Sequence, residues 1–129
     1  RDAQRVKETI LMVGEISDIY VSNYKKMLSD PNFRPEELVA IANGYTKLLG
    51  ESNNLLKELK QVVNITTLKM TDKERMDVVD CCYKEVRDYR NLVRYYTNKN
   101  ISVSYLRAQK QQDTDRVLSL YGTDNERYW

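Results

Sequence analysis

Two neighbouring cysteines, Cys81 and Cys82, are the side chains of this 129-residue sequence with the clearest potential for covalent or metal chemistry. Adjacent residues of a helix point about 100° apart, so the two thiols do not readily form a disulfide with each other. Two thiols also cannot supply the four ligands of a structural zinc site. The sequence contains no histidine, which excludes Ser-His-Asp and Cys-His catalysis and imidazole ligands. We therefore expect no enzymatic activity, no metal and no cofactor.

Charged residues are the next candidates. Arg87, Arg90 and Arg94 are spaced three and four apart, so they share one face of a helix that could contact phosphates. The formal net charge of the whole chain is only +2, so acidic residues on other helices could equally balance this face. Nucleic-acid binding through these arginines is therefore an alternative hypothesis. Carboxylates that share a helix face, such as Asp77 with Asp80, have no glycine-rich loop beside them, and we interpret them as surface charge.

Apolar and aromatic residues outside the expected core are candidates for binding a partner protein. The segment between the second and third predicted helices carries Ile65, Leu68 and Met70, although loops are normally polar. These side chains either cover one end of the core or form a docking surface. The chain has 10 tyrosines, and exposed aromatic residues are common at interfaces. We add those that lie off the predicted core stripe or in the polar tail, namely Tyr105, Tyr128 and Trp129.

Helices must position these residues. Glycine and proline are scarce, with 4 and 2 copies, which is typical of long helices. Pro31 ends the first helix, Pro35 opens the second, Thr71 and Glu74 match a capping box at the start of the third, and Gly122 follows the last. We predict a single domain with helices over about residues 1–29, 35–63, 72–110 and 114–121.

Apolar residues recur at helical spacing along each long helix, which predicts three core stripes. The predicted stripes are Val6, Ile10, Val13, Ile16, Tyr20, Tyr24 and Met27; then Leu38, Ile41, Tyr45, Leu48, Ser52, Leu55, Leu59 and Val62; then Val79, Cys82, Val86, Tyr89, Val93, Tyr96, Asn100 and Val103. The connection between the first two helices has only about five residues, which is typical of antiparallel neighbours. The three stripes and this short connection predict an all-α fold: an elongated antiparallel three-helix bundle (up-down-up) with a long third helix and a short C-terminal helix. Gly44, four residues after Ala40, could let a neighbouring helix approach closely.

The chain carries no obvious membrane segment, because no apolar run approaches the roughly 20 residues that a transmembrane helix needs. It begins at Arg1, already in a helical pattern, and we interpret this as a trimmed or processed N-terminus. An export segment before Arg1 is compatible with this beginning.

Several separated segments resemble one protein family. This family comprises conjugative-transposon transfer proteins of Bacteroides-type bacteria. Its members are described either as TraI-type conjugal transfer proteins or as a domain of unknown function. The resemblance covers essentially the whole chain and is carried by residues 27–33 with 35–38, 63–68 with 70–76, and 120–122 with 126–129. The resemblance does not extend to the relaxase that shares the TraI name. Relaxase chemistry needs a tyrosine beside a histidine-bound metal, and this sequence contains no histidine.

The resemblance implies a component of a type IV secretion-like conjugation apparatus, similar to a minor pilin subunit. It implies an exported, periplasmic or cell-surface protein whose partners are other transfer proteins and the recipient-cell surface. We therefore expect a non-enzymatic structural or adhesive role through protein contacts, with no small-molecule substrate. The alternatives are the nucleic-acid accessory protein described above and a cytoplasmic coiled-coil adaptor.

Overall fold

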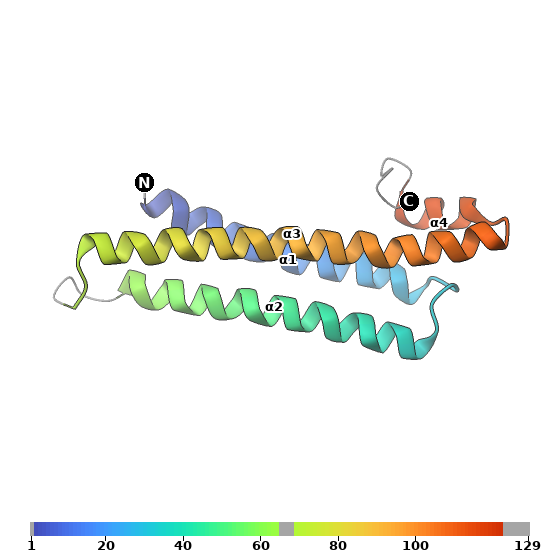
Figure 1. Ribbon diagram of the computed structural model, residues 1–129, viewed down its shortest axis with the longest axis horizontal. Helices are drawn as coiled ribbons and strands as arrows, with labels where there is room; N and C mark the ends of the chain where they lie inside the picture. Colours follow the sequence, from blue (N-terminus) through green and yellow to red (C-terminus); the bar gives the residue numbers. More distant parts are fainter. Residues whose placement is uncertain (1, 65–68, 123–129) are drawn as a thin grey trace. The chain divides into compact units, whose positions relative to one another are not determined.

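The computed structural model describes residues 2–64 and 69–122, and these residues form four α-helices and no strand (Figure 1). The helices are α1 (Asp2–Leu28), α2 (Pro35–Asn64), α3 (Asp72–Lys110) and α4 (Thr114–Tyr121). Each bound lies within one residue of the predicted one, and the all-helical class is confirmed for the described residues. None of these helices combines the length and apolarity that crossing a lipid bilayer requires.

Local signals explain where the helices begin and end. The capping box at the start of α3 is confirmed: the Glu74 amide donates to Thr71 Oγ1 and the Thr71 amide donates to Glu74 Oε1, each at 3.0 Å. A similar bond opens α2, where the Arg34 amide donates to Glu37 Oε1 at 2.9 Å. After α4 the chain turns at Gly122, whose φ of 104° is a backbone conformation that favours glycine.

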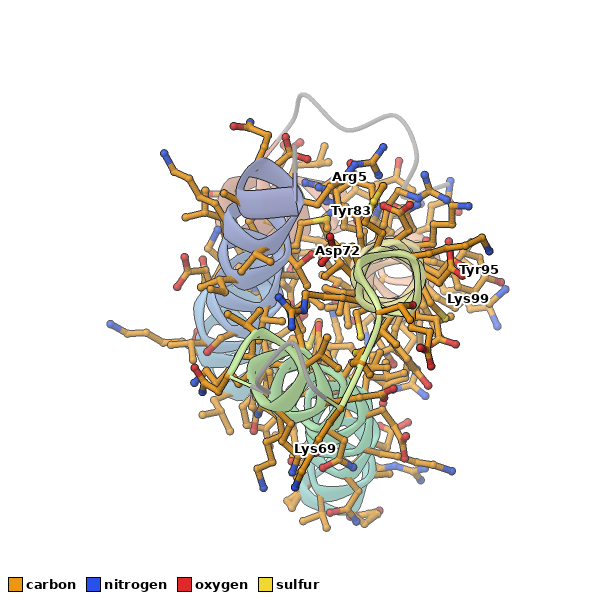
Figure 2. All side chains as sticks on the ribbon, turned by 90° about the vertical axis from the view of Figure 1, so that its left-hand side faces the viewer. Arg5, Lys69, Asp72, Tyr83, Tyr95 and Lys99 are labelled. Atoms are coloured by element: carbon orange, nitrogen blue, oxygen red, sulfur yellow. The ribbon has the colours of Figure 1, made fainter. Side chains whose placement is uncertain are left out.

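The chain divides into two compact units, which we describe separately. Unit 1 comprises residues 1–17 and 47–92, and unit 2 comprises residues 18–46 and 93–129. In unit 1 the start of α1, the end of α2 and the start of α3 bury a core of Val13, Ile16, Leu59, Val62, Val79, Cys82 and Val86. At its surface the Arg5 guanidinium lies over the Tyr83 ring, 4.3 Å from the ring centroid, and ties α1 to α3 (Figure 2).

Four tyrosines pack together in unit 2. The Tyr45 ring stacks on Tyr20 with centroids 4.8 Å apart and meets Tyr96 edge to face at 4.9 Å, while Tyr24 closes the group. The buried Tyr45 hydroxyl shares a 2.6 Å hydrogen bond with Thr97 Oγ1. Burial outweighs this bond and raises the pKa of Tyr45 to about 12. The cluster therefore joins α1, α2 and α3 through aromatic contacts, and the hydroxyls of Tyr24, Tyr45 and Tyr96 have polar partners.

Tyr96 reaches α2 because residue 44 is a glycine. The Tyr96 hydroxyl donates to the Ile41 carbonyl at 3.0 Å, and a Cβ on Gly44 would overlap the Tyr96 hydroxyl oxygen and lie 2.5 Å from the ring carbon that bears it. The close approach expected at Gly44 is thus confirmed, and the neighbour is an aromatic ring. Gly14 and Gly50 have no such neighbour, with open space where a Cβ would stand.

The connection between α1 and α2 is held by a buried aspartate. Asp30 Oδ2 accepts hydrogen bonds from the hydroxyls of Ser104 (2.6 Å) and Tyr121 (2.7 Å), and Oδ1 accepts one from the Asn32 amide (2.9 Å). One carboxylate therefore joins this connection to α3 and α4 within unit 2. It also gives the buried hydroxyls of Ser104 and Tyr121 an acceptor.

Two parts of the predicted core stripes are wrong. Ile10 is 45% exposed, because the buried stripe of α1 runs instead through Thr9, Met12, Val13 and Ile16. On α3 the fully buried positions after Val93 are Thr97, Ile101, Ser104 and Ala108. The predicted Tyr96, Asn100 and Val103 are half-buried beside them, with Tyr96 packed against Tyr45. A strict seven-residue repeat drifts about 20° per repeat around a straight helix, and the observed steps of three, four and four follow an 11-residue repeat instead.

Candidate functional site

The structure describes only part of the predicted partner-binding set. Ile65, Leu68, Tyr128 and Trp129 lie outside the described residues, so their assignment stays a prediction. Met70 is half-buried. Tyr105 is also half-buried and takes part in at least one interaction, so it is not a freely exposed aromatic platform.

The predicted arginine face is not a row of three solvent-facing cations. The Arg90 side chain is only 24% exposed, and its Nη1 lies 3.7 Å from Glu15 Oε2 on α1. Arg87 is exposed, with its Nε 3.9 Å from Asp88 Oδ1, and Arg94 is exposed with an interaction of its own. The buried stripe of α3 follows an 11-residue repeat, and Arg90 lies 11 residues after Val79 and 11 before Ile101. Arg90 therefore falls on this stripe and faces the Glu15 carboxylate on α1.

An apolar groove opens in unit 1 where α1, α2 and α3 meet. It has a volume of about 560 Å³ and is lined by Ala3, Val6, Lys7, Ile10, Leu11, Val63, Arg75 and Val79. Ile10, Leu11 and Val63 are 45%, 57% and 46% exposed. Single exposed apolar residues are ordinary on a protein surface, but three large ones lining the same groove are typical of a contact surface. Ile10 and Leu11 are adjacent on α1, which widens its apolar face beyond the buried stripe.

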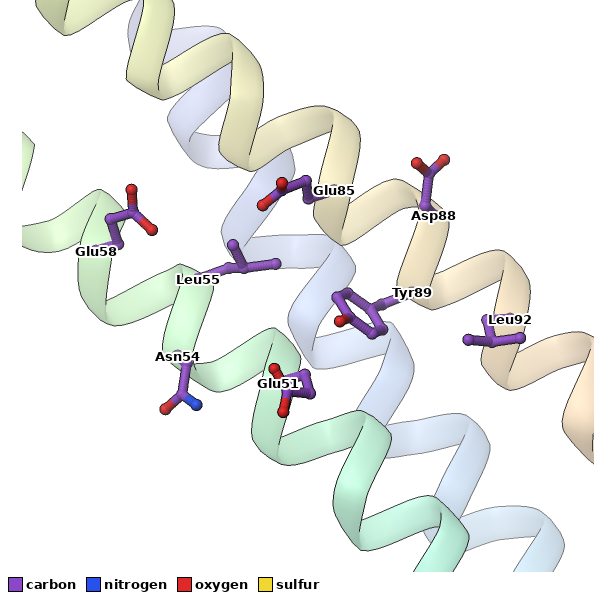
Figure 3. A pocket seen from close by; sticks show the side chains of 8 residues that line it. All are labelled: Glu51, Asn54, Leu55, Glu58, Glu85, Asp88, Tyr89 and Leu92. Atoms are coloured by element: carbon purple, nitrogen blue, oxygen red, sulfur yellow. The ribbon is translucent and has the colours of Figure 1, made fainter.

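An acidic groove of about 480 Å³ lies in the same unit between α2 and α3 (Figure 3). It is lined by four carboxylates, those of Glu51, Glu58, Glu85 and Asp88. Asn54 and three side chains that offer apolar surface, Leu55, Tyr89 and Leu92, complete the lining. In Figure 3 the Leu55 and Tyr89 side chains point into the space between the two helices. The groove thus has an apolar floor and an acidic rim.

The thiols beside this groove are poor nucleophiles. Burial raises the pKa of Cys82 to about 11, and the nearby carboxylates of Glu58 and Glu85 add to this effect. Cys81 is exposed, yet burial of its sulfur and the same two carboxylates also raise its pKa. Both cysteines therefore stay protonated at neutral pH, where nucleophilic chemistry needs a thiolate.

Polar groups of unit 2 are used in contacts between its own helices. Arg107 donates to both oxygens of Glu37, at 2.8 and 2.7 Å, and to the Asn32 carbonyl at 2.7 Å. The hydrogen bonds from Arg107 and from the Arg34 amide lower the pKa of Glu37 from 4.5 to about 2. This arrangement fastens the start of α2 to the end of α3.

The described residues hold no cluster of three or more histidine, cysteine or acidic side chains that could bind a metal ion. No protein-family model, curated protein or solved structure matches the chain.

Sequence reasoning missed both grooves of unit 1. Ile10 was assigned to the core, Leu11 and Val63 were off the predicted stripes, and the carboxylates of the acidic groove were not singled out. A signal for the acidic groove does exist, because Glu51 with Glu58 and Glu85 with Leu92 are seven residues apart and share helix faces. Only the pairing of α2 with α3 shows that these two faces line the same groove.

Proposed function

We propose that this chain is a non-enzymatic structural or adhesive component of a bacterial conjugative transfer apparatus of the type IV secretion kind. Its expected partners are other transfer proteins, and its expected location is outside the cytoplasm. The conjugative part of the proposal rests on the resemblance of separated sequence segments to TraI-type transfer proteins. The protein-contact part rests on the apolar groove.

The proposed architecture is the antiparallel up-down-up bundle, with α4 as a short fourth helix. Contacts within unit 2 support it. The Tyr24 hydroxyl, late in α1, donates to the Leu38 carbonyl, early in α2, at 2.8 Å. Glu37, also early in α2, pairs with Arg107, late in α3, at 2.7 Å. Both contacts are those of helices that run in opposite directions.

The apolar groove is the single observation that carries the contact role. Its three exposed apolar residues come from two helices, and Lys7 and Arg75 complete its lining. Burying such a surface against a partner releases roughly 25 cal/mol per Å² of apolar area. An exposed apolar groove without catalytic groups beside it favours binding of another protein over chemistry.

The test compares two double variants in a strain that performs conjugative transfer. Ile10→Ser with Val63→Ser removes the apolar rim of the groove, and Val39→Ser with Leu106→Ser removes two exposed apolar side chains from unit 2. We expect the first pair to lose co-purification with transfer proteins and to lower transfer frequency about tenfold or more, and the second pair to behave as the wild type. Circular dichroism must show the same helix content in both.

Two results would count against the proposal. If deleting the gene leaves transfer frequency unchanged, the conjugative role is wrong. If the Ile10/Val63 variant folds and transfers as the wild type does, the groove is not the contact surface. The test then moves to the segment with Ile65 and Leu68 and to the tail residues Tyr128 and Trp129.

A further inference from the structure

The acidic groove repeats one pattern on both of its helices. On α2, Glu51, Leu55 and Glu58 follow at steps of four and three, so a carboxylate stands one turn before and one turn after an apolar residue. On α3, Glu85 and Leu92 flank Tyr89 with the same steps, and Asp88 adds a second carboxylate. Residues at these steps share a helix face, so each helix presents apolar side chains to the groove with a carboxylate one turn away along its axis.

Three of the four carboxylates of this groove have no ion-pair partner among the described residues. Among the described residues, Glu51, Glu58 and Glu85 form no ion pair, and Asp88 has only the 3.9 Å contact with Arg87. The groove contributes −4 to a chain whose formal net charge is +2, so the remaining residues together carry +6. The lining contains no lysine or arginine, so the groove itself is negative.

The size and chemistry of the groove define its occupant. The seven-residue separation between Glu51 and Glu58 spans about 11 Å, or two turns of helix. A guest helix lying along α2 and α3 would place apolar side chains against Leu55, Tyr89 and Leu92, with its cations one turn away, opposite the carboxylates. Nucleic acid does not fit, because its phosphates would face four carboxylates.

We propose that the acidic groove binds a basic amphipathic helix of a partner protein, with the apolar side chains of that helix against Leu55, Tyr89 and Leu92 and its lysines or arginines beside the carboxylates. This inference rests on the proposed function, since it names the chemistry of one partner. The apolar groove, whose charged residues are Lys7 and Arg75, has the opposite character and serves a different contact.

The direct test uses synthetic peptides and the full chain. One fluorescent peptide of about 18 residues, long enough to form a helix, carries leucines at steps of three and four with lysines on both flanks. A second peptide replaces every lysine with glutamate. We expect fluorescence anisotropy to show saturable binding of the lysine peptide that weakens with added salt, and no binding of the glutamate peptide.

Variants of the chain locate the binding. Removing two carboxylates with Glu58→Gln and Glu85→Gln should weaken binding roughly twofold to thirtyfold, the loss expected for two exposed charge pairs. Glu8→Gln with Asp18→Asn changes the net charge equally away from the groove and should change binding less than about twofold. Leu92→Ser should weaken binding, while Leu106→Ser on the same helix, with a similar exposed fraction of 53% against 45%, should not.

Three results would overturn the inference: no binding of the lysine peptide, equal binding of the glutamate peptide, or equal weakening by the groove and control variants. Each leaves the proposed function standing, because co-purification with transfer proteins is measured separately and depends on Ile10 and Val63. If the peptide binds as expected while deletion of the gene leaves transfer unchanged, the groove assignment stands and the conjugative role falls.

Discussion

Replacing Gly44 with alanine should destabilise the protein, although alanine is the better helix former. Gly44 lies inside α2 against the ring of Tyr96, which is fixed by its hydrogen bond to the Ile41 carbonyl and by its edge-to-face contact with Tyr45. A Cβ at position 44 would lie 2.5 Å from the Tyr96 ring carbon that bears the hydroxyl. The ring must therefore move away, and both of its contacts change.

The expected size follows from opposing terms. Alanine gains about 1 kcal/mol over glycine in a helix interior. Loss of the hydrogen bond from Tyr96 to Ile41 costs about 1 kcal/mol, and forcing a ring out of a packed position costs about 1–3 kcal/mol more. The net effect is a loss of about 1–3 kcal/mol in the free energy of unfolding.

Urea unfolding followed by circular dichroism measures this difference, and Gly50→Ala is the matched control. Gly50 lies on the same helix with no atom within 4 Å of the added Cβ, so this variant should be about 1 kcal/mol more stable than the wild type. The two substitutions are chemically identical and should have opposite signs. If Gly44→Ala is as stabilising as Gly50→Ala, the contact between Tyr96 and α2 does not exist in solution.

Two further predictions concern the polar contacts of unit 2. The pKa of Glu37 is lowered to about 2, so its ionised form stabilises the fold fully above the ordinary value near 4.5, and this contribution is lost as pH falls from about 4.5 towards 2. Glu37→Gln should therefore remove part of the acid dependence of the unfolding midpoint between these pH values, as measured by thermal melts. Asp30→Ala should lower the free energy of unfolding by about 3 kcal/mol, because it leaves two buried hydroxyls and an amide without their acceptor. Tyr121→Phe removes one of these bonds and should cost about 1–2 kcal/mol in the same urea experiment.

Nearby substitutions serve as controls for these predictions. Glu36→Gln changes an exposed carboxylate beside Glu37 and should leave the acid dependence as it is in the wild type. Ser119→Ala changes an exposed residue of α4 and should leave the free energy of unfolding within about 0.5 kcal/mol. Equal acid dependence of the Glu37 variant and the wild type would contradict the role given to Arg107. An unchanged unfolding midpoint for Asp30→Ala would contradict the stabilising role given to the buried carboxylate of Asp30.

The helices could be predicted from the sequence because their ends are marked by local chemistry. Pro31 and Pro35 act on the backbone beside them, and the Thr71–Glu74 capping box uses only atoms within three residues of one another. The close approach at Gly44 was predictable for the same reason, although the identity of its neighbour was not. Tyr96 is 52 residues away along the chain, and no local pattern links the two.

The burial pattern and both grooves depend on distant parts of the chain. Ile10 has the right type and spacing for a core residue, but it is 45% exposed beside a groove. The charge of Arg90 indicated a solvent face, whereas the 11-residue period of α3 places it beside Glu15. The acidic groove likewise exists only because α2 and α3 each contribute half of its rim.

The buried carboxylate of Asp30 also determines how the chain responds to mechanical load. An eight-residue helix such as α4 is not stable alone in water, so it depends on Val117, Tyr121 and the hydrogen bond to Asp30. Among the described residues, the hydroxyl–carboxylate bond from Tyr121 is a direct link between α4 and the connection that joins α1 to α2. Under tension α4 should therefore detach before the 39-residue α3 loses a turn.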